Sequence, residues 1–273
     1  MQKAISPAPP PCYNRGKYRH SRPERKLSAM KQPKIFAHRG ASSYAPENTL
    51  PAFALAASQG ADGIELDVHL TRDGQLVVIH DETLERTTNG SGWVKDHTLA
   101  QLQQLRADNH MPGFADAGIP TLEQVLELVK PTGMLVNIEL KTSLIWYEGL
   151  EEKTVELVRA MGMEDRVIYS SFNHYSIEKV RQLDPEAETA YLYSDILCDV
   201  EKYAAARGVK GLHPGLWNVQ MGDFLRIYLD SGLAVRVWTV NERQDMEQLL
   251  TAGADVITND PVLALQVRKE LGL

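Results

Sequence analysis

The chain has 273 residues, of which 43% are hydrophobic and 24% charged, and this length is enough for one large α/β barrel or for two ordinary domains. No apolar run approaches the roughly 18–20 residues that span a bilayer, which argues against a stable membrane anchor. Two cysteines, Cys12 and Cys198, provide neither a disulfide framework nor a metal cluster, so we expect a reducing, cytoplasmic compartment.

The charge is unevenly distributed along the chain. Residues 1–29 carry seven basic residues and one acid, which leaves 22 basic and 35 acidic residues, a net charge of −13, for the remainder. An acidic body argues against nucleic acid as a partner. Residues 1–33 are rich in proline and arginine and lack apolar periodicity, which predicts a disordered basic extension rather than a secretory signal. A basic arm that contacts an anionic lipid is the alternative.

From residue 34 onward, strand patterns and helix patterns alternate. The predicted strands are 34–38, 63–68, 76–80, 134–140, 166–171, 188–193, 209–213, 234–240 and 255–258, and the predicted helices are 49–59, 121–130, 150–161, 174–183, 199–207, 220–231, 242–251 and 261–271. The helix at 121–130 is typical, since its apolar residues recur with a period of 3.6. Alternation of this kind and this length predicts an α/β fold, a TIM (β/α)₈ barrel, over 34–273.

Nine predicted strands are one more than such a barrel holds. The turn TRDGQ is too short to join parallel strands, so we expect 76–80 to return antiparallel to 63–70 as a hairpin. Pairing across this turn places His80 opposite Leu66 or Asp67. These residues would then meet at the C-terminal mouth, where barrel enzymes keep their catalytic groups.

The segment after this hairpin, at about 81–120, contains no full βα unit. We predict a small insertion over the mouth, with a short amphipathic helix at 98–107.

Three acids near strand ends indicate a metal site. Glu65 and Asp67 lie two residues apart on an apolar strand, and a period of two points both to the same face. Two such carboxylates repel each other and are costly to bury unless a cation lies between them. Glu139 ends the next apolar strand of the barrel. Three carboxylates form a hard oxygen site suited to Mg²⁺ or Ca²⁺, whereas one solvated acid and one ion-paired acid is the alternative.

Two histidines and two cations accompany these acids. His38 and His80 each close an apolar strand, and imidazole can accept or donate a proton near neutral pH. We rank an acid/base pair above the alternative that they are metal ligands. Arg39 and Lys141 beside a dication require an anion such as phosphate, unless each pairs with a neighbouring acid. The combination fits hydrolysis of a phosphate ester.

Trp238 lies at the end of another predicted strand. A single tryptophan is most often a core or rim residue. Its place at the predicted mouth makes a role in the substrate wall the alternative.

The chain resembles the glycerophosphodiester phosphodiesterase family, and most closely its bacterial, cytoplasmic-type members. The matching motifs are HRG, PENTLPAF, GADGIELDVHLTRDGQLVVIHD, ERTTNGSG, IPTLEQVL, NIELK, SSF and VWTVN, spread over about residues 34–271. The resemblance implies a barrel with an inserted segment, a divalent metal, and hydrolysis of glycerophosphodiesters to sn-glycerol 3-phosphate and an alcohol. Position by position, it implies metal ligands at Glu65, Asp67 and Glu139, an acid/base pair at His38 and His80, phosphate contacts at Arg39 and Lys141, and a glycerol-side wall at Trp238. The basic extension inherits nothing from it.

Two other functions fit the same motifs less well. A lysophospholipase D-type enzyme would use the same barrel, but the insertion lacks a long apolar stretch, and this favours a small soluble diester as the substrate. A barrel that only binds a phosphodiester should have lost a histidine or a metal ligand, and none is missing. A homodimer is compatible with the sequence.

Overall fold

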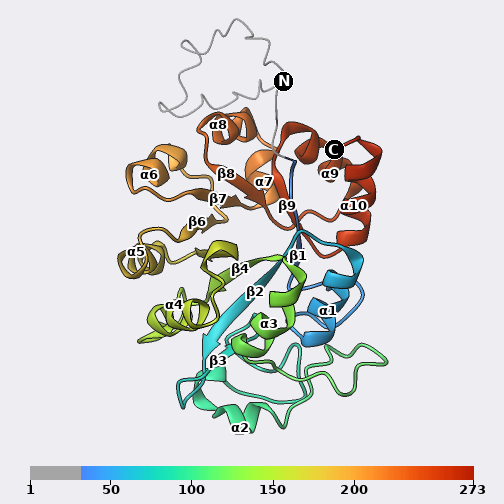
Figure 1. Cartoon of the computed structure of the whole chain (residues 1–273), viewed down its shortest axis with the longest axis vertical. Helices are drawn as coiled ribbons and strands as arrows, with labels where there is room; N and C mark the ends of the chain where they lie inside the picture. Colours follow the sequence, from blue (N-terminus) through green and yellow to red (C-terminus); the bar gives the residue numbers. More distant parts are fainter. Residues whose placement is uncertain (1–31) are drawn as a thin grey trace, which may run out of the picture.

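Eight parallel strands close into a barrel in the computed structural model of the chain, which describes residues 32–273 (Figure 1). The strands are β1 (Ile35–His38), β2 (Gly63–Leu70), β4 (Leu135–Leu140), β5 (Val167–Ser171), β6 (Glu188–Tyr193), β7 (Gly211–Pro214), β8 (Ala234–Val237) and β9 (Asp255–Thr258). The barrel closes because β1 pairs in parallel with both β2 and β9. The predicted TIM barrel is confirmed. The basic extension predicted for 1–33 lies almost wholly outside the described residues.

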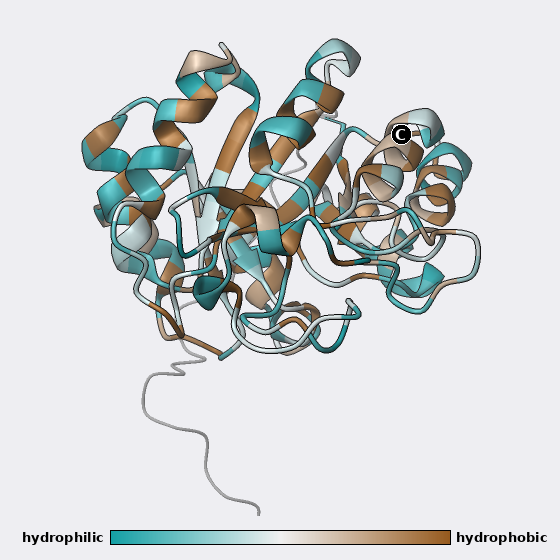
Figure 2. Ribbon diagram, turned by 90° about the horizontal axis from the view of Figure 1, so that it is seen from below, coloured by the Kyte–Doolittle hydropathy of each residue, from teal (hydrophilic) through white to brown (hydrophobic). Residues whose placement is uncertain are grey.

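Helices surround the barrel and cover the outer faces of its strands (Figure 1). The α-helices of the described residues are α1 (Leu50–Gln59), α2 (Leu99–Leu102), α3 (Leu122–Val129), α4 (Leu150–Ala160), α5 (His174–Leu183), α6 (Val200–Ala206), α7 (Leu216–Val219), α8 (Phe224–Asp230), α9 (Arg243–Ala252) and α10 (Pro261–Glu270). Of these, α2 lies in the insertion after β3 and not against the barrel strands. In Figure 2 hydrophobic residues run along the strands, whereas the helices alternate between hydrophobic and hydrophilic residues. This pattern is expected where each helix buries one stripe against the sheet. Between residues 32 and 273, no helix is long and apolar enough to cross a membrane.

The ninth strand, β3 (Leu76–Val78), pairs antiparallel to β2 and confirms the predicted hairpin. Val68 lies opposite Val78, and the Ile79 amide donates to the Asp67 carbonyl oxygen at 3.1 Å. This register carries the chain on to His80, which leaves the hairpin next to the carboxylate-bearing strand.

The insertion that follows β3 has a small core of its own. Its buried apolar residues are Val77, Ile79, Leu84, Val94, Leu102, Ala107 and Ile119. The helix predicted at 98–107 is wrong in length, since α2 ends at Leu102. The Arg106 amide donates to the Asn89 side chain at 2.8 Å and the Ala107 amide donates to the Ala117 carbonyl at 2.7 Å. These bonds replace the ones that a longer helix would make.

The helix predicted at 220–231 is also wrong in its extent. Within this range the structure has one helix, α8, which begins only at Phe224. The short helix α7 ends at Val219, before the range, and Gly222 lies between the two helices with φ of +52°. A residue in the left-handed region ends a right-handed helix, and glycine adopts that region without a steric penalty.

Candidate active site

Three carboxylates converge at the C-terminal mouth of the barrel. Glu65 and Asp67 point inward from β2, and Glu139 lies beside Asp67 on β4 in register. All three side chains are buried, and one oxygen atom of each lies within 4.8 Å of the others. The strand period therefore assembles the predicted set of acids.

Burial and mutual repulsion disturb the ionisation of these acids. Burial raises the pKa of Glu65 well above its usual value, and the neighbouring Asp67 and Glu139 raise it further. The pKa of Glu139 is raised for the same reasons, although Lys141 opposes the shift. Burial also works against ionisation of Asp67, but His80 and Lys141 outweigh it and lower the pKa.

The donor set fits a hard divalent cation. It consists only of carboxylate oxygens, which Mg²⁺ and Ca²⁺ prefer. Among the described residues, Asp67 Oδ1 is buried without a hydrogen-bond partner, and Lys141 Nζ lies 3.7 Å from it. A buried oxygen left without a donor is unusual, and a bound cation would satisfy it.

His38 and His80 both lie beside these acids, but their partners differ. His38 Nδ1 lies 2.6 Å from Asn259 Oδ1, and its Nε2 lies 3.9 Å from Glu65 Oε2. Burial, followed by the charge of Arg39, lowers the pKa of His38 to about 4. His80 Nδ1 lies 2.6 Å from the Asp81 carboxylate. In both rings Nδ1 has a hydrogen-bond partner, so Nε2 is the nitrogen that can exchange a proton with a substrate.

The two predicted phosphate contacts are paired with acids. Arg39 Nη1 donates to Glu47 Oε1 at 2.8 Å, and its Nε lies 3.6 Å from Asp67 Oδ2. Lys141 Nζ lies 2.9 Å from Glu139 Oε1. Pairing with neighbouring acids was the alternative expectation, and both cations nevertheless lie at the carboxylate cluster.

Residues without a predicted role complete this side of the site. Asn48 donates from Nδ2 to Asp67 Oδ2 at 2.8 Å. His69, inward-facing two residues after Asp67, places Nε2 3.1 Å from the His80 carbonyl oxygen and Nδ1 3.1 Å from the Tyr147 hydroxyl. The period of two that revealed the acids also marks His69, whereas no periodic signal marks Asn48, which lies in a loop.

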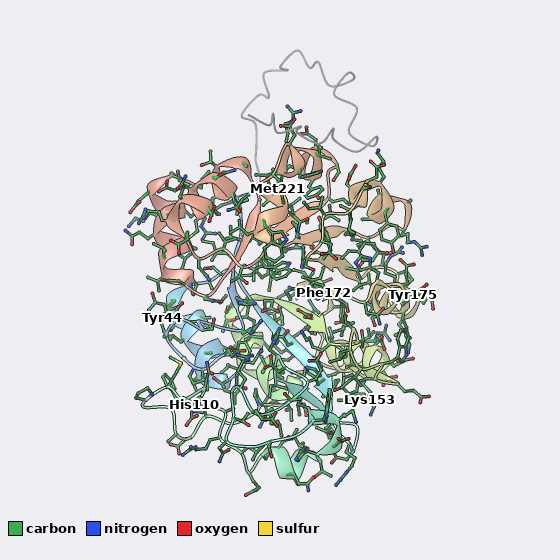
Figure 3. The ribbon with its side chains drawn as sticks, turned by 180° about the vertical axis from the view of Figure 1, so that it is seen from behind. Tyr44, His110, Lys153, Phe172, Tyr175 and Met221 are labelled. Atoms are coloured by element: carbon green, nitrogen blue, oxygen red, sulfur yellow. The ribbon has the colours of Figure 1, made fainter. Side chains whose placement is uncertain are left out.

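Trp238 lies across the mouth from the carboxylates, just after β8. Its Nε1 donates to the His213 carbonyl at 2.8 Å, and its ring meets Phe172 and Trp217 edge to face at 5.5 and 5.7 Å. Phe172 lies near the centre of the molecule in Figure 3, with Tyr175 and Met221 farther out. Other exposed apolar residues lie in the segments that follow β4 to β7, with Tyr175 in the first turn of α5 and the others in loops, namely Leu144, Trp146, Ile196, Leu197 and Met221. We call this set, with Phe172 and Trp217, the apolar rim.

The sequence of the chain is similar to that of a known enzyme family. Residues 38–263 match the sequence profile of the glycerophosphoryl diester phosphodiesterase family. A glycerophosphodiester phosphodiesterase of Caldanaerobacter subterraneus is 42% identical over 240 residues, covering 87% of this chain and 98% of the relative. One from Bacillus altitudinis is 42% identical over 244 residues, covering 87% and 99%.

Solved structures of phosphodiesterases are also similar to this chain. A phosphodiesterase of Oleispira antarctica, in complex with the product sn-glycerol-3-phosphate, superposes with a TM-score of 0.78 at 31% identity, covering 87% of this chain and 97% of that one. A glycerophosphodiester phosphodiesterase of Agrobacterium tumefaciens superposes with a TM-score of 0.75 at 32% identity, covering 86% and 99%.

Proposed function

The chain belongs to the glycerophosphoryl diester phosphodiesterase family, and on this premise we propose that it hydrolyses glycerophosphodiesters to sn-glycerol 3-phosphate and an alcohol, using a divalent metal and two histidines. The enzyme class follows from the family and from the relatives. The single observation that carries the mechanism is the meeting of three buried carboxylates with two histidines at one mouth. The product bound to the Oleispira antarctica enzyme supports the choice of product.

The proposal includes a divalent metal because the three clustered carboxylates are suitable ligands for one. Glu65, Asp67 and Glu139 would hold Mg²⁺ or Ca²⁺, and a bound cation of this kind polarises phosphoryl oxygens and lowers the pKa of a coordinated hydroxyl or water.

The protein's own groups bind the diester and move protons. Arg39 and Lys141 lie at the cluster and would bind the phosphoryl oxygens, exchanging part of their present pairing for the substrate. One histidine Nε2 accepts the proton of the attacking oxygen as that oxygen bonds to phosphorus, and the other donates a proton to the alcohol oxygen as its bond to phosphorus breaks. Attack by water gives sn-glycerol 3-phosphate directly, whereas attack by the neighbouring glycerol hydroxyl gives a cyclic phosphate that water then opens in a second step. Trp238 would form the wall beside the glycerol.

A diester panel tests the reaction. Glycerophosphocholine, glycerophosphoethanolamine and bis(p-nitrophenyl) phosphate are offered to the purified protein with Mg²⁺, with Ca²⁺ and with EDTA, and products are identified by mass. We expect sn-glycerol 3-phosphate and the free alcohol from the first two, in the metal arms only. Release of phosphocholine instead would place cleavage on the wrong side of the phosphorus and contradict the proposal.

The apolar rim favours a second candidate, a lysophospholipase D-type activity on a lipid diester. Trp146, in the loop after β4, is 65% exposed, and Tyr175, in the first turn of α5, is 77% exposed, and an acyl chain could pack on both of them. The insertion lacks such residues apart from Trp93, which is why the soluble diester remains our first choice. Comparing kcat/KM for glycerophosphocholine and lysophosphatidylcholine separates the two, and a higher value for the lipid would reverse the order.

A further inference from the structure

Arg86 lies in the insertion between the carboxylates of Asp81 and Glu47, and its guanidinium donates two hydrogen bonds to each of them. Its Nε and Nη2 donate to Asp81 Oδ2 and Oδ1 at 2.7 and 3.0 Å. Its Nη1 and Nη2 donate to Glu47 Oε2 and Oε1 at 2.8 and 2.7 Å. The planar guanidinium, with donors on two edges, is suited to such paired contacts, and an ammonium group is not.

Each of these carboxylates also contacts a group of the active site. Asp81 Oδ1 lies 2.6 Å from His80 Nδ1, and Glu47 Oε1 accepts from Arg39 Nη1 at 2.8 Å. One side chain of the insertion therefore connects a histidine proposed to move protons with a cation proposed to bind phosphate.

We propose that Arg86 is a positioning residue that sets the orientation of His80 through Asp81 and of Arg39 through Glu47, an inference that rests on the proposed function. Without the guanidinium, Asp81 and Glu47 would lose the group that bridges them, and Asp81 would be free to turn toward solvent. His80 would then lose the acceptor that fixes its tautomer and ring angle. Arg39 would keep Glu47, but Glu47 would no longer be held in place.

A purely structural role for Arg86 predicts something different. Arg86 is 43% exposed, and exposed ion pairs generally contribute little to stability. If Arg86 only fastened the insertion, its loss would lower the melting temperature and would combine independently with the loss of Asp81. If it acts through Asp81, the two losses overlap.

The experiment is a double-mutant cycle on kcat with glycerophosphocholine at saturating Mg²⁺. The variants are R86M, R86K, D81N and R86M/D81N. The control is R106M, since Arg106 is another exposed arginine of the insertion that pairs with Asp108 at 3.4 Å. We expect R86M to lower kcat about 10–100-fold, the range common for groups that orient catalytic ligands, and R86K to recover part of the loss. R86M/D81N should be no slower than the slower single variant, and R106M should match the wild type.

Three outcomes would overturn the inference: an unchanged kcat in R86M, equal rates in R86M and R106M, or multiplicative losses in the double variant. Melting temperatures are measured in parallel, and if R86M unfolds at the assay temperature the cycle is run with R86K in its place. Failure of the proposed function is distinguishable, because the wild type itself would then release no sn-glycerol 3-phosphate.

Discussion

The two halves of the barrel mouth differ in chemistry. The half built by β1, β2 and β4 is charged and buried, with Glu65, Asp67 and Glu139 meeting Arg39 and Lys141. The half built by β5 to β8 is aromatic and partly exposed, with Trp238 between two perpendicular rings. Under the proposed function, we expect the charged half to carry out the chemistry and the aromatic half to bind the glycerol side of the substrate.

The halves also differ in what they do for stability. Aromatic rings packed edge to face stabilise the fold. Three acids pressed together in a buried site destabilise it until a cation binds, as the raised pKa values of Glu65 and Glu139 indicate. Such local conflicts are expected where function, rather than stability, selects the residues. Variants in each half therefore test whether catalysis depends on the charged half and substrate binding on the aromatic half.

The largest effect is expected from the histidines of the charged half. H38A and H80A should each lower kcat about 10²–10⁴-fold, because each removes a proton-transfer group, with little change in melting temperature. The control is H110A, since His110 is exposed in the insertion. Near-wild-type turnover in either variant would remove that histidine from the mechanism.

The next largest loss of activity is expected from the acids of the carboxylate cluster. E65Q and D67N should weaken Mg²⁺ binding and lower the rate together, each by at least about tenfold, because each removes a charged ligand. Calorimetric titration of the metal-free proteins gives the affinity. Unchanged metal titrations in both variants would show that these carboxylates are not ligands.

The pH dependence of stability should reveal the same cluster. The pKa of Glu65 is raised in the folded state, so its protonated form is the one that folding favours. Its contribution to the free energy of unfolding is present below the ordinary glutamate pKa and is lost as pH rises through the folded value. Urea unfolding of the metal-free proteins should therefore show that the free energy of unfolding of E65Q increases relative to that of the wild type as pH rises from 5 to 8. Saturating Mg²⁺ should cancel this gain, and a gain that shrinks with rising pH would contradict the assignment.

The smallest effect is expected from the aromatic half. W238F should raise KM for glycerophosphocholine about 2–10-fold, the range for one lost aromatic contact of about 0.5–1.5 kcal/mol, while kcat stays within about threefold. A loss of kcat as large as that of H80A would mean that the division between the two halves is wrong.

Regular periodicity explains which parts of this molecule the sequence predicts. A period of two placed Glu65 and Asp67 on one face, and a short turn required the hairpin that carries His80 to them. Long-range contacts between loops have no such period. Arg86 meets Glu47 across 39 residues of chain, and neither position lies in a helix or strand.

Element ends were predicted less well than elements for a related reason. The helix at 98–107 has the right apolar pattern, but backbone bonds to Asn89 and Ala117 end it early. Such competition depends on segments that come together only in the folded chain.

The most direct test of the central claim is release of sn-glycerol 3-phosphate from glycerophosphocholine as Mg²⁺ is added back to EDTA-treated protein. The wild type should go from almost no release to full turnover along a saturable curve. E65Q should need far more metal and reach a lower rate. Equal release with and without metal, or superimposable curves for the two proteins, would contradict a metal-dependent phosphodiesterase built on these carboxylates.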